Sequence, residues 1–425
     1  MKKLDINIQN LSKIEGHADL AVKVRQGEVQ SVQLGFTESK RFFTQAIKNK
    51  NLHMLPQSVA RICGTCSIAH TLCCLEGLEK ALNVQVSPQT ALLKKLTMYG
   101  LMIRDHALHM YLFSLPDVFN KDSVLDFSGV ESKFLHQSFD VKRAGNKLST
   151  AVAGRAVHAP FPVIGGFAQV PHPEEIKDCR VELKKARDAL FDVLEVYYNC
   201  PIDYSRPTDF VGLVNNPFDF LEGDIVSSDG THVPESKYRD FLHKVVIPYS
   251  ESVGYTFDKK TYMVGALARL NLNKQSLHKD TRKDAAKFLQ VFPSNNIFHN
   301  NLAQGIEILH SIDHSLEILE SAEFKLEAPV PVKVKQCEGI GVIEAPRGTL
   351  FYKLLMDGKG IIKKGTIIVP TQQNQINMEL DIKNLVQRSL ASLSHDQIEY
   401  EIEKLIRAYD PCISCATHFL KVRWV

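Results

Sequence analysis

Two stretches of alternating apolar and polar residues near the start of the chain predict β-strands. They cover residues 18–25 and 28–36 and are separated by a Gln-Gly pair at residues 26–27, which favours a tight turn. A similar pair of stretches covers residues 349–356 and 361–369 and is joined by an Asp-Gly turn. The pattern therefore predicts one β-hairpin towards each end of the chain.

Three longer stretches repeat apolar residues at the spacing of an α-helix. The first begins at Ser87 and Pro88, a capping residue followed by proline at the first helical position, and extends to about residue 115. The second covers residues 173–198, and the third covers residues 389–408. The sequence shows no internal repeat and no flexible linker. We therefore expect a single, mainly α-helical body with small β-sheets, an α+β fold.

The composition is that of an ordinary globular protein. The chain has 425 residues, of which 44% are hydrophobic and 23% are charged, and its net charge is +3. Such a small charge argues against binding to nucleic acid. No apolar run approaches the roughly 18 residues needed to span a membrane, and polar residues from Asp5 onward interrupt the start of any signal peptide. We therefore expect a cytoplasmic protein without a membrane span.

Two CxxC pairs stand near opposite ends of the chain: Cys63 with Cys66, and Cys412 with Cys415. Two thiolates at this spacing can face one metal ion from a helical turn or a tight loop. A local zinc ribbon is excluded, because its second pair follows the first within roughly 15–20 residues. A site that uses both pairs must therefore be built from the two ends of the chain. On spacing alone, a closed tetrahedral zinc site is favoured.

The other cysteines are scattered, and each is expected to be a small buried residue. No further CxxC-type array remains for an iron–sulfur cluster, and neither a GxGxxG nor a Walker A loop is present for a nucleotide. The chain should therefore hold one metal site and depend on other subunits for electron transfer. These cysteines are Cys73, Cys74, Cys179, Cys200 and Cys337.

His310 and His314 are four residues apart in a predicted helix, a spacing that can bind zinc. The Ser-Ile-Asp sequence between them lacks the glutamate of an HExxH motif. A structural pair of histidines is therefore the preferred interpretation.

The residues around both CxxC pairs, at positions 61–70 and 410–418, closely resemble the two signature motifs of the nickel–iron hydrogenase large subunit. Three further blocks resemble other motifs of the family and occur in the family's order: residues 13–17, 105–117 and 344–371. Accidental agreement of five ordered blocks is improbable, so the resemblance favours this family over the zinc site. It implies the family's large-subunit fold, in which the N- and C-terminal segments meet at a buried metal site.

The resemblance implies that Cys63 and Cys412 are terminal nickel ligands, and that Cys66 and Cys415 bridge nickel to an iron ion. In the family this iron also carries carbon monoxide and cyanide. Four anionic sulfurs make such a site electron-rich, and thiolates suit both metals. The implied activity is the reversible heterolytic cleavage of dihydrogen into protons and electrons.

Glu15 resembles the family's glutamate that passes the proton outward, a task for which partial burial can bring a pKa close to the working pH. Arg347 resembles the guanidinium that overhangs the metals, and Pro346 shapes the same pocket. Asp410 resembles the acid that holds this arginine, and Asp117 is a second candidate for that role. Without the motifs, Glu15 would be interpreted as an exposed capping acid and Asp410 as part of a turn.

His70 resembles a hydrogen-bond partner of the thiolates, although a lone histidine four residues after a cysteine is more often structural. Two positions depart from the family. Lys13 replaces the usual arginine, which is a mild change. Thr44 replaces a glutamate that, with the C-terminal histidine, here His418, normally binds a separate magnesium or iron ion. The sequence therefore predicts that this third metal is absent or weakly held.

The run from Ala408 to Cys415 and the short segment after His418 resemble the NAD(P)-linked bidirectional hydrogenases, also called sulfhydrogenases. This subgroup implies a hetero-oligomer, in which a small subunit carries iron–sulfur clusters and further subunits carry flavin and NAD(P) sites. It also implies one multi-lobed large-subunit domain over residues 1–418. The following tail, residues 419–425, would be removed by a maturation endopeptidase.

Two other classes of protein fit parts of the pattern. A zinc-stapled structural protein fits the cysteines alone. A catalytically inert subunit of a respiratory complex fits the other blocks, but such relatives have lost the metal ligands, whereas all four cysteines are present here. The metal content distinguishes the three classes: nickel with iron, zinc, or none.

Overall fold

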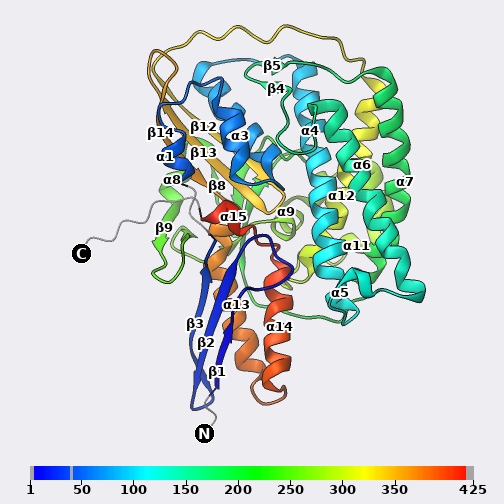
Figure 1. Ribbon diagram of the computed structural model, residues 1–425, viewed down its shortest axis with the longest axis vertical. Helices are drawn as coiled ribbons and strands as arrows, with labels where there is room; N and C mark the ends of the chain where they lie inside the picture. Colours follow the sequence, from blue (N-terminus) through cyan, green and yellow to red (C-terminus); the bar gives the residue numbers. More distant parts are fainter. Residues whose placement is uncertain (1–3, 39–41, 418–425) are drawn as a thin grey trace.

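The computed structural model describes residues 4–38 and 42–417 (Figure 1). Long helices form one side of the molecule, and small sheets with their own helices form the other. One large hydrophobic core runs through most of these elements, and a smaller core lies among the central strands. This architecture confirms the mainly helical fold with small sheets.

The first predicted hairpin belongs to an antiparallel sheet in the order β1 (Leu4–Ile8), β2 (Ala18–Arg25) and β3 (Glu28–Phe36). Alternate residues of β2 are buried, because successive side chains of a strand point to opposite faces of a sheet. The sheet packs through β3 against α13 (Pro370–Ser389). The hairpin is therefore confirmed, with its strands at the predicted residues.

The second predicted hairpin also belongs to a three-stranded antiparallel sheet, in the order β12 (Cys337–Ala345), β13 (Gly348–Met356) and β14 (Ile362–Ile368). The sequence pattern predicts β13 and β14 but misses β12, which is buried over most of its length and so lacks alternation. Ala345 pairs with Gly348 across the turn. The two residues between them therefore form the tip of the β12–β13 hairpin.

Helix α3 (Ser67–Leu82) packs closely against β12. A Cβ atom on Gly339 would lie 1.9 Å from the carbonyl oxygen of Gly77, so only glycine permits this approach of helix and strand. The contact fixes Cys66, just before α3, relative to Arg347 at the hairpin tip.

The helical side of the molecule is a bundle of α4 (Pro88–Ala107), α6 (Ser132–Ala153), α7 (Pro173–Tyr198) and α12 (His299–Ser321). Ser87 accepts a hydrogen bond from the amide of Thr90 at 3.1 Å and so caps α4 as predicted. Helix α7 spans the residues predicted for the second helix. The bundle therefore confirms both predicted long helices in this half of the chain.

After Ala107 the chain continues as a π-helical segment, Leu108–Ser114, and then as α5 (Leu115–Val118). The sequence predicts an uninterrupted helix here, so the helical path is confirmed but the wider π turns are not anticipated. Such turns are uncommon and often lie at functional sites. This one carries His109.

The remaining strands form small sheets of two or four strands. They are β4 (Pro162–Val163), β5 (Gly166–Phe167), β6 (Asp209–Val214), β7 (Asp224–Ser227), β8 (His232–Val233), β9 (Leu242–Val246), β10 (Val253–Phe257) and β11 (Tyr262–Met263). The short connecting helices are α1 (Phe43–Ala46), α2 (Leu55–Val59), α8 (Tyr238–Phe241), α9 (Ala266–Asn273), α10 (Lys279–Asp284) and α11 (Ala286–Leu289).

The start of the helix predicted over residues 389–408 is wrong. Helix α13 ends at Ser389, and the next helix, α14 (His395–Ala408), begins after Ser394. The Ser394 hydroxyl accepts a hydrogen bond from the backbone amide of Gln397, and the side-chain oxygen of Gln397 accepts one from the backbone amide of Ser394. This capping box explains why α14 begins directly after Ser394. Helix α14 still leads directly into the second CxxC pair, as predicted.

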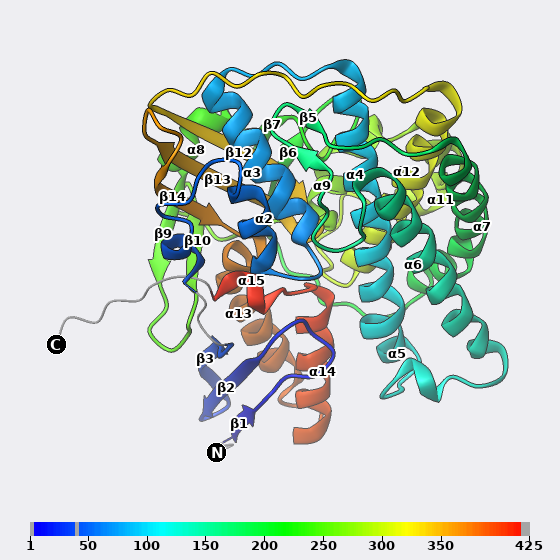
Figure 2. The ribbon, with the colours of Figure 1, turned by 45° about the horizontal axis from the view of Figure 1, so that its top comes forward.

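The segments that carry Glu15 and Cys412 meet as a parallel β-bridge, in which the Ile413 amide donates to the Glu15 carbonyl at 2.9 Å. The following helix, α15 (Ile413–Ala416), lies between α3 and the N-terminal strands (Figure 2). The predicted meeting of N- and C-terminal segments is therefore confirmed. No helix among the described residues combines the length and apolar character needed to cross a membrane.

Candidate metal centre

The four cysteines of the two CxxC pairs converge at one buried point. Their sulfur atoms all lie within 4.8 Å of one another. Cys63 is 3.5 Å from Cys412, Cys66 is 3.1 Å from Cys415, and Cys412 is 2.9 Å from Cys415. The structure thus brings together the residues for which the sequence predicts a shared metal centre, one pair from each end of the chain.

Each pair is placed by the start of a helix. Cys66 is the N-cap residue of α3, and Cys412 is the N-cap residue of α15. The Cys412 amide donates to the Thr371 hydroxyl at 2.9 Å, and Gln372 Nε2 donates to the carbonyl of Ala416 at 3.0 Å. These two contacts from α13 fix the second pair. Sequence analysis assigns them no role: Thr371 is the last residue of the block at 344–371, and Gln372 follows it directly.

Without a bound cation, the protein cannot keep all four cysteines deprotonated while their sulfur atoms lie this close together. Hydrogen bonding with Cys412 is the main cause that lowers the pKa of Cys63 well below its usual value. Burial raises the pKa of Cys412 and of Cys415 well above the usual value. Deprotonation of Cys412 and Cys415 therefore requires a cation bound among the sulfur atoms. Four thiolate donors suit nickel, iron or zinc, so the residues present fit a thiophilic metal centre.

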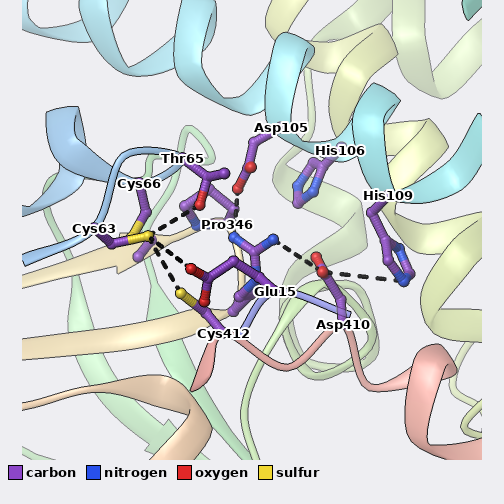
Figure 3. A network of polar contacts seen from close by, with 12 residues as sticks. Glu15, Cys63, Thr65, Cys66, Asp105, His106, His109, Pro346, Asp410 and Cys412 are labelled. Carbon is purple, nitrogen blue, oxygen red and sulfur yellow. Dashed lines mark hydrogen bonds and ion pairs between the residues drawn. The ribbon is translucent and has the colours of Figure 1, made fainter. Parts of the chain in front are cut away.

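Glu15 lies beside this centre (Figure 3). Its Oε1 is 3.9 Å from the sulfur of Cys63, and its Oε2 accepts a hydrogen bond from the Ser414 amide at 3.0 Å. Burial, and next the charge of Cys63, raise the pKa of Glu15 above its usual value. The carboxyl group is therefore placed to exchange a proton with a sulfur of the centre.

Arg347 lies at the hairpin tip between two carboxylates. Its Nη1 donates to Asp105 Oδ2 at 2.6 Å and its Nη2 donates to Asp410 Oδ1 at 2.9 Å. Burial opposes the charge of Arg347, but Asp105 and Asp410 outweigh it and raise the pKa of Arg347 well above its usual value. Asp410 thus holds this arginine, whereas sequence analysis gave Asp105 no role.

A small cavity separates the cysteines from Arg347. Its volume is about 20 Å³, enough for one molecule of the size of water. Its walls include Cys66, Cys412, Cys415, His70, Pro346 and Arg347. Only a very small substrate fits between the sulfurs and the guanidinium.

Asp117 lies elsewhere, which corrects its proposed role as a holder of Arg347. It accepts hydrogen bonds from Nε and Nη2 of Arg407 at 2.6 and 2.9 Å, and from Nζ of Lys13 at 2.8 Å. Its contacts therefore tie α14 to the N-terminal segment. The carboxylate on the other side of Arg347 is that of Asp105.

His70 bridges a thiol and a tyrosine. Its Nδ1 is 2.8 Å from the Tyr352 hydroxyl and its Nε2 is 3.5 Å from the sulfur of Cys415. A metal-bound thiolate can only accept, so Nε2 then carries the proton and the Tyr352 hydroxyl donates to Nδ1. The position agrees with the hydrogen-bonding role that the sequence suggests for His70.

Sequence analysis misses a buried arginine, Arg269, that binds the backbone at the hairpin tip. Arg269 is fully buried and donates to both carboxylate oxygens of Glu307 at 2.6 Å and to Glu344 at 2.7 Å. The same guanidinium donates to the carbonyls of Ala345 and Pro346 at 3.1 and 3.0 Å. It therefore fixes the backbone just before Arg347. No spacing or motif marks this arginine in the sequence.

Two other predicted features lie apart from the centre or outside the described residues. Thr44 lies half-buried in α1. His418 and the tail at 419–425 are outside the described residues, so the weak third metal and the removable tail stay predictions.

His310 and His314 do not join the metal centre. The backbone amide of His278 donates to His310 Nδ1 at 3.0 Å, and His314 Nδ1 is 2.7 Å from the Tyr99 hydroxyl. Burial lowers the pKa of His310 to about 3, so this side chain is neutral near pH 7. These contacts agree with a structural pair.

Comparison with known proteins agrees with this site. The sequence model described as nickel-dependent hydrogenase matches residues 41–158 and 240–418, which together make up more than half of the chain. A solved structure of an NAD⁺-reducing NiFe-hydrogenase in the H2-reduced state superimposes with a TM-score of 0.87. It shares 23% sequence identity and covers 98% of this chain and 99% of its own, so it shows the common fold.

Curated relatives cover the same span. Sulfhydrogenase 2 subunit alpha of Pyrococcus furiosus is 28% identical over 98% of this chain and 100% of its own length. NAD-reducing hydrogenase HoxS subunit beta of Cupriavidus necator is 26% identical over 97% of this chain and 94% of its own length. With four cysteines converging in the matching fold and the family match over most of the chain, this protein belongs to the nickel-dependent hydrogenase family.

Proposed function

We propose that this chain is the catalytic subunit of a nickel–iron hydrogenase and catalyses the reversible heterolytic cleavage of dihydrogen. The observation that carries the proposal is the convergence of four buried cysteines, three of which line a cavity for one very small molecule, with Glu15 3.9 Å from the sulfur of the fourth. When bound, a nickel–iron pair with carbon monoxide and cyanide on iron would polarise dihydrogen and take up its electrons.

The cysteines divide into two roles in this proposal. Cys63 and Cys412 would hold nickel alone, whereas Cys66 and Cys415 would bridge nickel and iron. This division rests on the resemblance of the two CxxC pairs to the family's signature motifs, because the sulfur of Cys415 lies as close to Cys412, at 2.9 Å, as to Cys66, at 3.1 Å. His70 would donate a hydrogen bond to Cys415 and so stabilise its thiolate.

Glu15 would move the proton. A cysteine sulfur receives the proton first, and the Glu15 carboxylate then takes it across the 3.9 Å that separate Oε1 from Cys63. The raised pKa of Glu15 brings its proton affinity closer to that of a thiolate, which makes transfer in both directions easier. The Ser414 amide holds the other oxygen and so keeps the carboxylate in position.

Arg347 would shape the space in which dihydrogen reacts. Asp105 and Asp410 hold its guanidinium rigidly, and Pro346 forms part of the same wall. A fixed positive charge above the sulfurs favours negative charge that develops there during heterolysis. The cavity also excludes bulk water, because it admits a single small molecule.

Electron transfer would need partner chains. Among the described residues the four converging cysteines are the only cluster of thiols that could hold a metal, so no relay leads away from the centre. Sulfhydrogenase and NAD-reducing relatives are named as subunits of larger enzymes. We propose an iron–sulfur small subunit as the immediate acceptor, with flavin and NAD(P) subunits beyond it in the cytoplasm.

Maturation would involve residues 419–425. In the proposed sequence of events an endopeptidase removes this tail after nickel is inserted, and the mature chain then ends at His418. A threonine at position 44 would leave the neighbouring third metal absent or weakly held, because magnesium sites normally use carboxylates.

Metal analysis with infrared spectroscopy tests the proposed function. Purified complex should contain nickel and iron and show bands from carbon monoxide and cyanide bound to iron. Zinc without these bands would establish a zinc-stapled structural protein instead. A complex with no metal would establish an inert structural subunit.

A further inference from the structure

His109 lies in the π-helical segment, beyond Asp410 on the side away from the cysteines (Figure 3). Its side chain is buried, and each ring nitrogen is within hydrogen-bond distance of one oxygen atom. Nδ1 is 2.6 Å from Oε1 of Gln304, and Nε2 is 2.7 Å from the carbonyl oxygen of Arg407. The protonation of the ring therefore depends on whether these oxygens accept or donate.

The carbonyl oxygen of Arg407 can only accept a hydrogen bond, so Nε2 of His109 must donate. The same carbonyl also accepts from the backbone amide of Asp410 at 2.8 Å. The two lone pairs of this oxygen are thus used by His109 and Asp410 together.

The amide orientation of Gln304 is set by Asp410. Gln304 Nε2 donates to Asp410 Oδ2 at 2.9 Å, while Asp410 Oδ1 accepts from Arg347. A flipped amide would aim its oxygen at the carboxylate, so that two acceptors would face each other. Oε1 of Gln304 therefore faces His109, and Nδ1 of His109 must also donate.

We infer that His109 is held as an imidazolium cation, protonated on both ring nitrogens, and acts as a positioning residue that fixes Asp410 through Gln304. A cationic ring also faces a negative charge, because Asp410 is one of the two buried carboxylates that hold Arg347.

Two further arginines lie near this group: Arg104, whose charge acts on Asp105 and whose Nη2 donates to the Thr65 carbonyl at 2.7 Å, and Arg407. The guanidinium of Arg407 is already bound to Asp117 and Glu403. His109 Nε2 itself lies 4.0 Å from Asp410 Oδ1, close enough for direct attraction between the charges.

Asp410 needs such support because its backbone is strained. Its φ of 52° lies in the left-handed region, which non-glycine residues rarely adopt. His109 fixes both parts of the residue: it reaches the side chain through Gln304 and the backbone through the Arg407 carbonyl. The position of Arg347 over the cavity follows from the position of Asp410.

Neutron diffraction tests the protonation of His109. Crystals of the assembled, metal-loaded enzyme in heavy water at a pD of about 8 should show deuterium on both ring nitrogens. Deuterium on one nitrogen alone overturns the inference. This result does not depend on activity, so its failure is distinct from a failure of the proposed function.

A double-mutant cycle tests the positioning role, which rests on the proposed function. Gln304→Met removes the bridge and should slow hydrogen–deuterium exchange about 10–100-fold at unchanged nickel content. In an Asp410→Asn background the same substitution should have a much smaller effect, because Gln304 acts through Asp410.

Equal losses in both backgrounds would show that Gln304 acts independently of Asp410, and would overturn the positioning role. Gln304→Asn keeps the amide but is too short to span both partners. It should give the same pattern and serves if Gln304→Met does not fold. Nickel bound per chain identifies a variant that loses activity merely through misfolding.

Discussion

The Glu15 Oε1 atom lies 3.9 Å from the sulfur of Cys63, although these residues belong to different parts of the N-terminal half and share no secondary-structure element. The Ser414 amide holds the other oxygen. The carboxyl group therefore depends on both ends of the chain for its position, and its chemistry can be tested apart from metal binding.

Glu15→Gln should block proton transfer and leave the metals in place. The amide keeps the shape and can still accept the hydrogen bond from Ser414, but it cannot carry the proton. We expect normal nickel content with a fall in exchange and turnover of about 10²-fold or more. Glu15→Asp, which keeps a titratable group, is the control and should retain more activity. Wild-type exchange in Glu15→Gln would show that another group relays the proton.

Cys412→Ser should abolish both nickel binding and hydrogen uptake. A hydroxyl is a harder and far less acidic ligand than a thiol, so it does not replace a thiolate at a nickel centre. We expect the same result for each of the other three converging cysteines. Cys337→Ser, at a partly exposed position away from the centre, is the matched control and should keep both nickel and activity. Nickel retained in Cys412→Ser would contradict the assignment.

Arg347→Lys should impair turnover more than metal binding. Lysine carries a point charge and cannot bond Asp105 and Asp410 in the two fixed directions of a guanidinium. The expected loss is about 10²-fold in turnover per nickel. Asp117→Asn is the contrasting variant. It breaks the buried pair with Arg407 and should lower the free energy of unfolding by about 3–5 kcal/mol at unchanged turnover per nickel.

His310→Asn should make the protein less sensitive to acid. The native state keeps His310 neutral, with a pKa of about 3, whereas the unfolded chain protonates it near pH 6.5. The contribution of the neutral His310 to the free energy of unfolding is therefore fully present above pH ~6.5. It is lost as the pH falls towards the native pKa, and the loss at pH 5 is ~2 kcal/mol.

The asparagine oxygen can still accept from the His278 amide but does not titrate. Urea unfolding of wild type and His310→Asn at pH 7 and pH 5 measures the difference. His232→Asn, at an exposed strand position, is the control. An unchanged pH dependence in His310→Asn would assign the acid sensitivity to other groups.

Thr44→Glu should strengthen binding of a third metal near the C-terminal segment. A carboxylate supplies the charged oxygen that a hydroxyl lacks, and magnesium sites normally use one or two carboxylates. We expect more magnesium or iron per chain and a higher melting temperature, with nickel content unchanged. Thr44→Gln is the matched neutral variant and should give neither gain. Anomalous diffraction showing a fully occupied octahedral metal at His418 in wild type would contradict the prediction.

The sequence predicts elements well where the signal is local. The Gln-Gly turn and the alternation on either side predict the first hairpin, and Pro173 predicts the start of α7. Strand β12 is missed because both of its faces are covered, so its residues do not alternate. The break before α14 is missed although Ser394 and Gln397 carry a capping signal.

The sequence predicts the residues that lie at the metal centre but not the buried residues that hold them in position. Ordered motifs identify the cysteines, Glu15 and Arg347, since their chemistry restricts which residues can serve. The choice between Asp105 and Asp117 depends on which faces of one continuous helical path they occupy. A π-helical segment lies between the two and alters that phase. Buried partners such as Arg269 have no local pattern, because their contacts come from distant segments.

The bridge between Glu15 and Cys412 means that the ribosome must have passed residue 412 before the metal centre can form. Cys63 and Cys412 are 349 residues apart, a distance that a ribosome covers in roughly 20–70 s. During that time the first cysteine pair waits without its counterparts. A chain that is abandoned before Cys415 has no complete set of ligands, so such faulty translation yields an inert product rather than a partly active one.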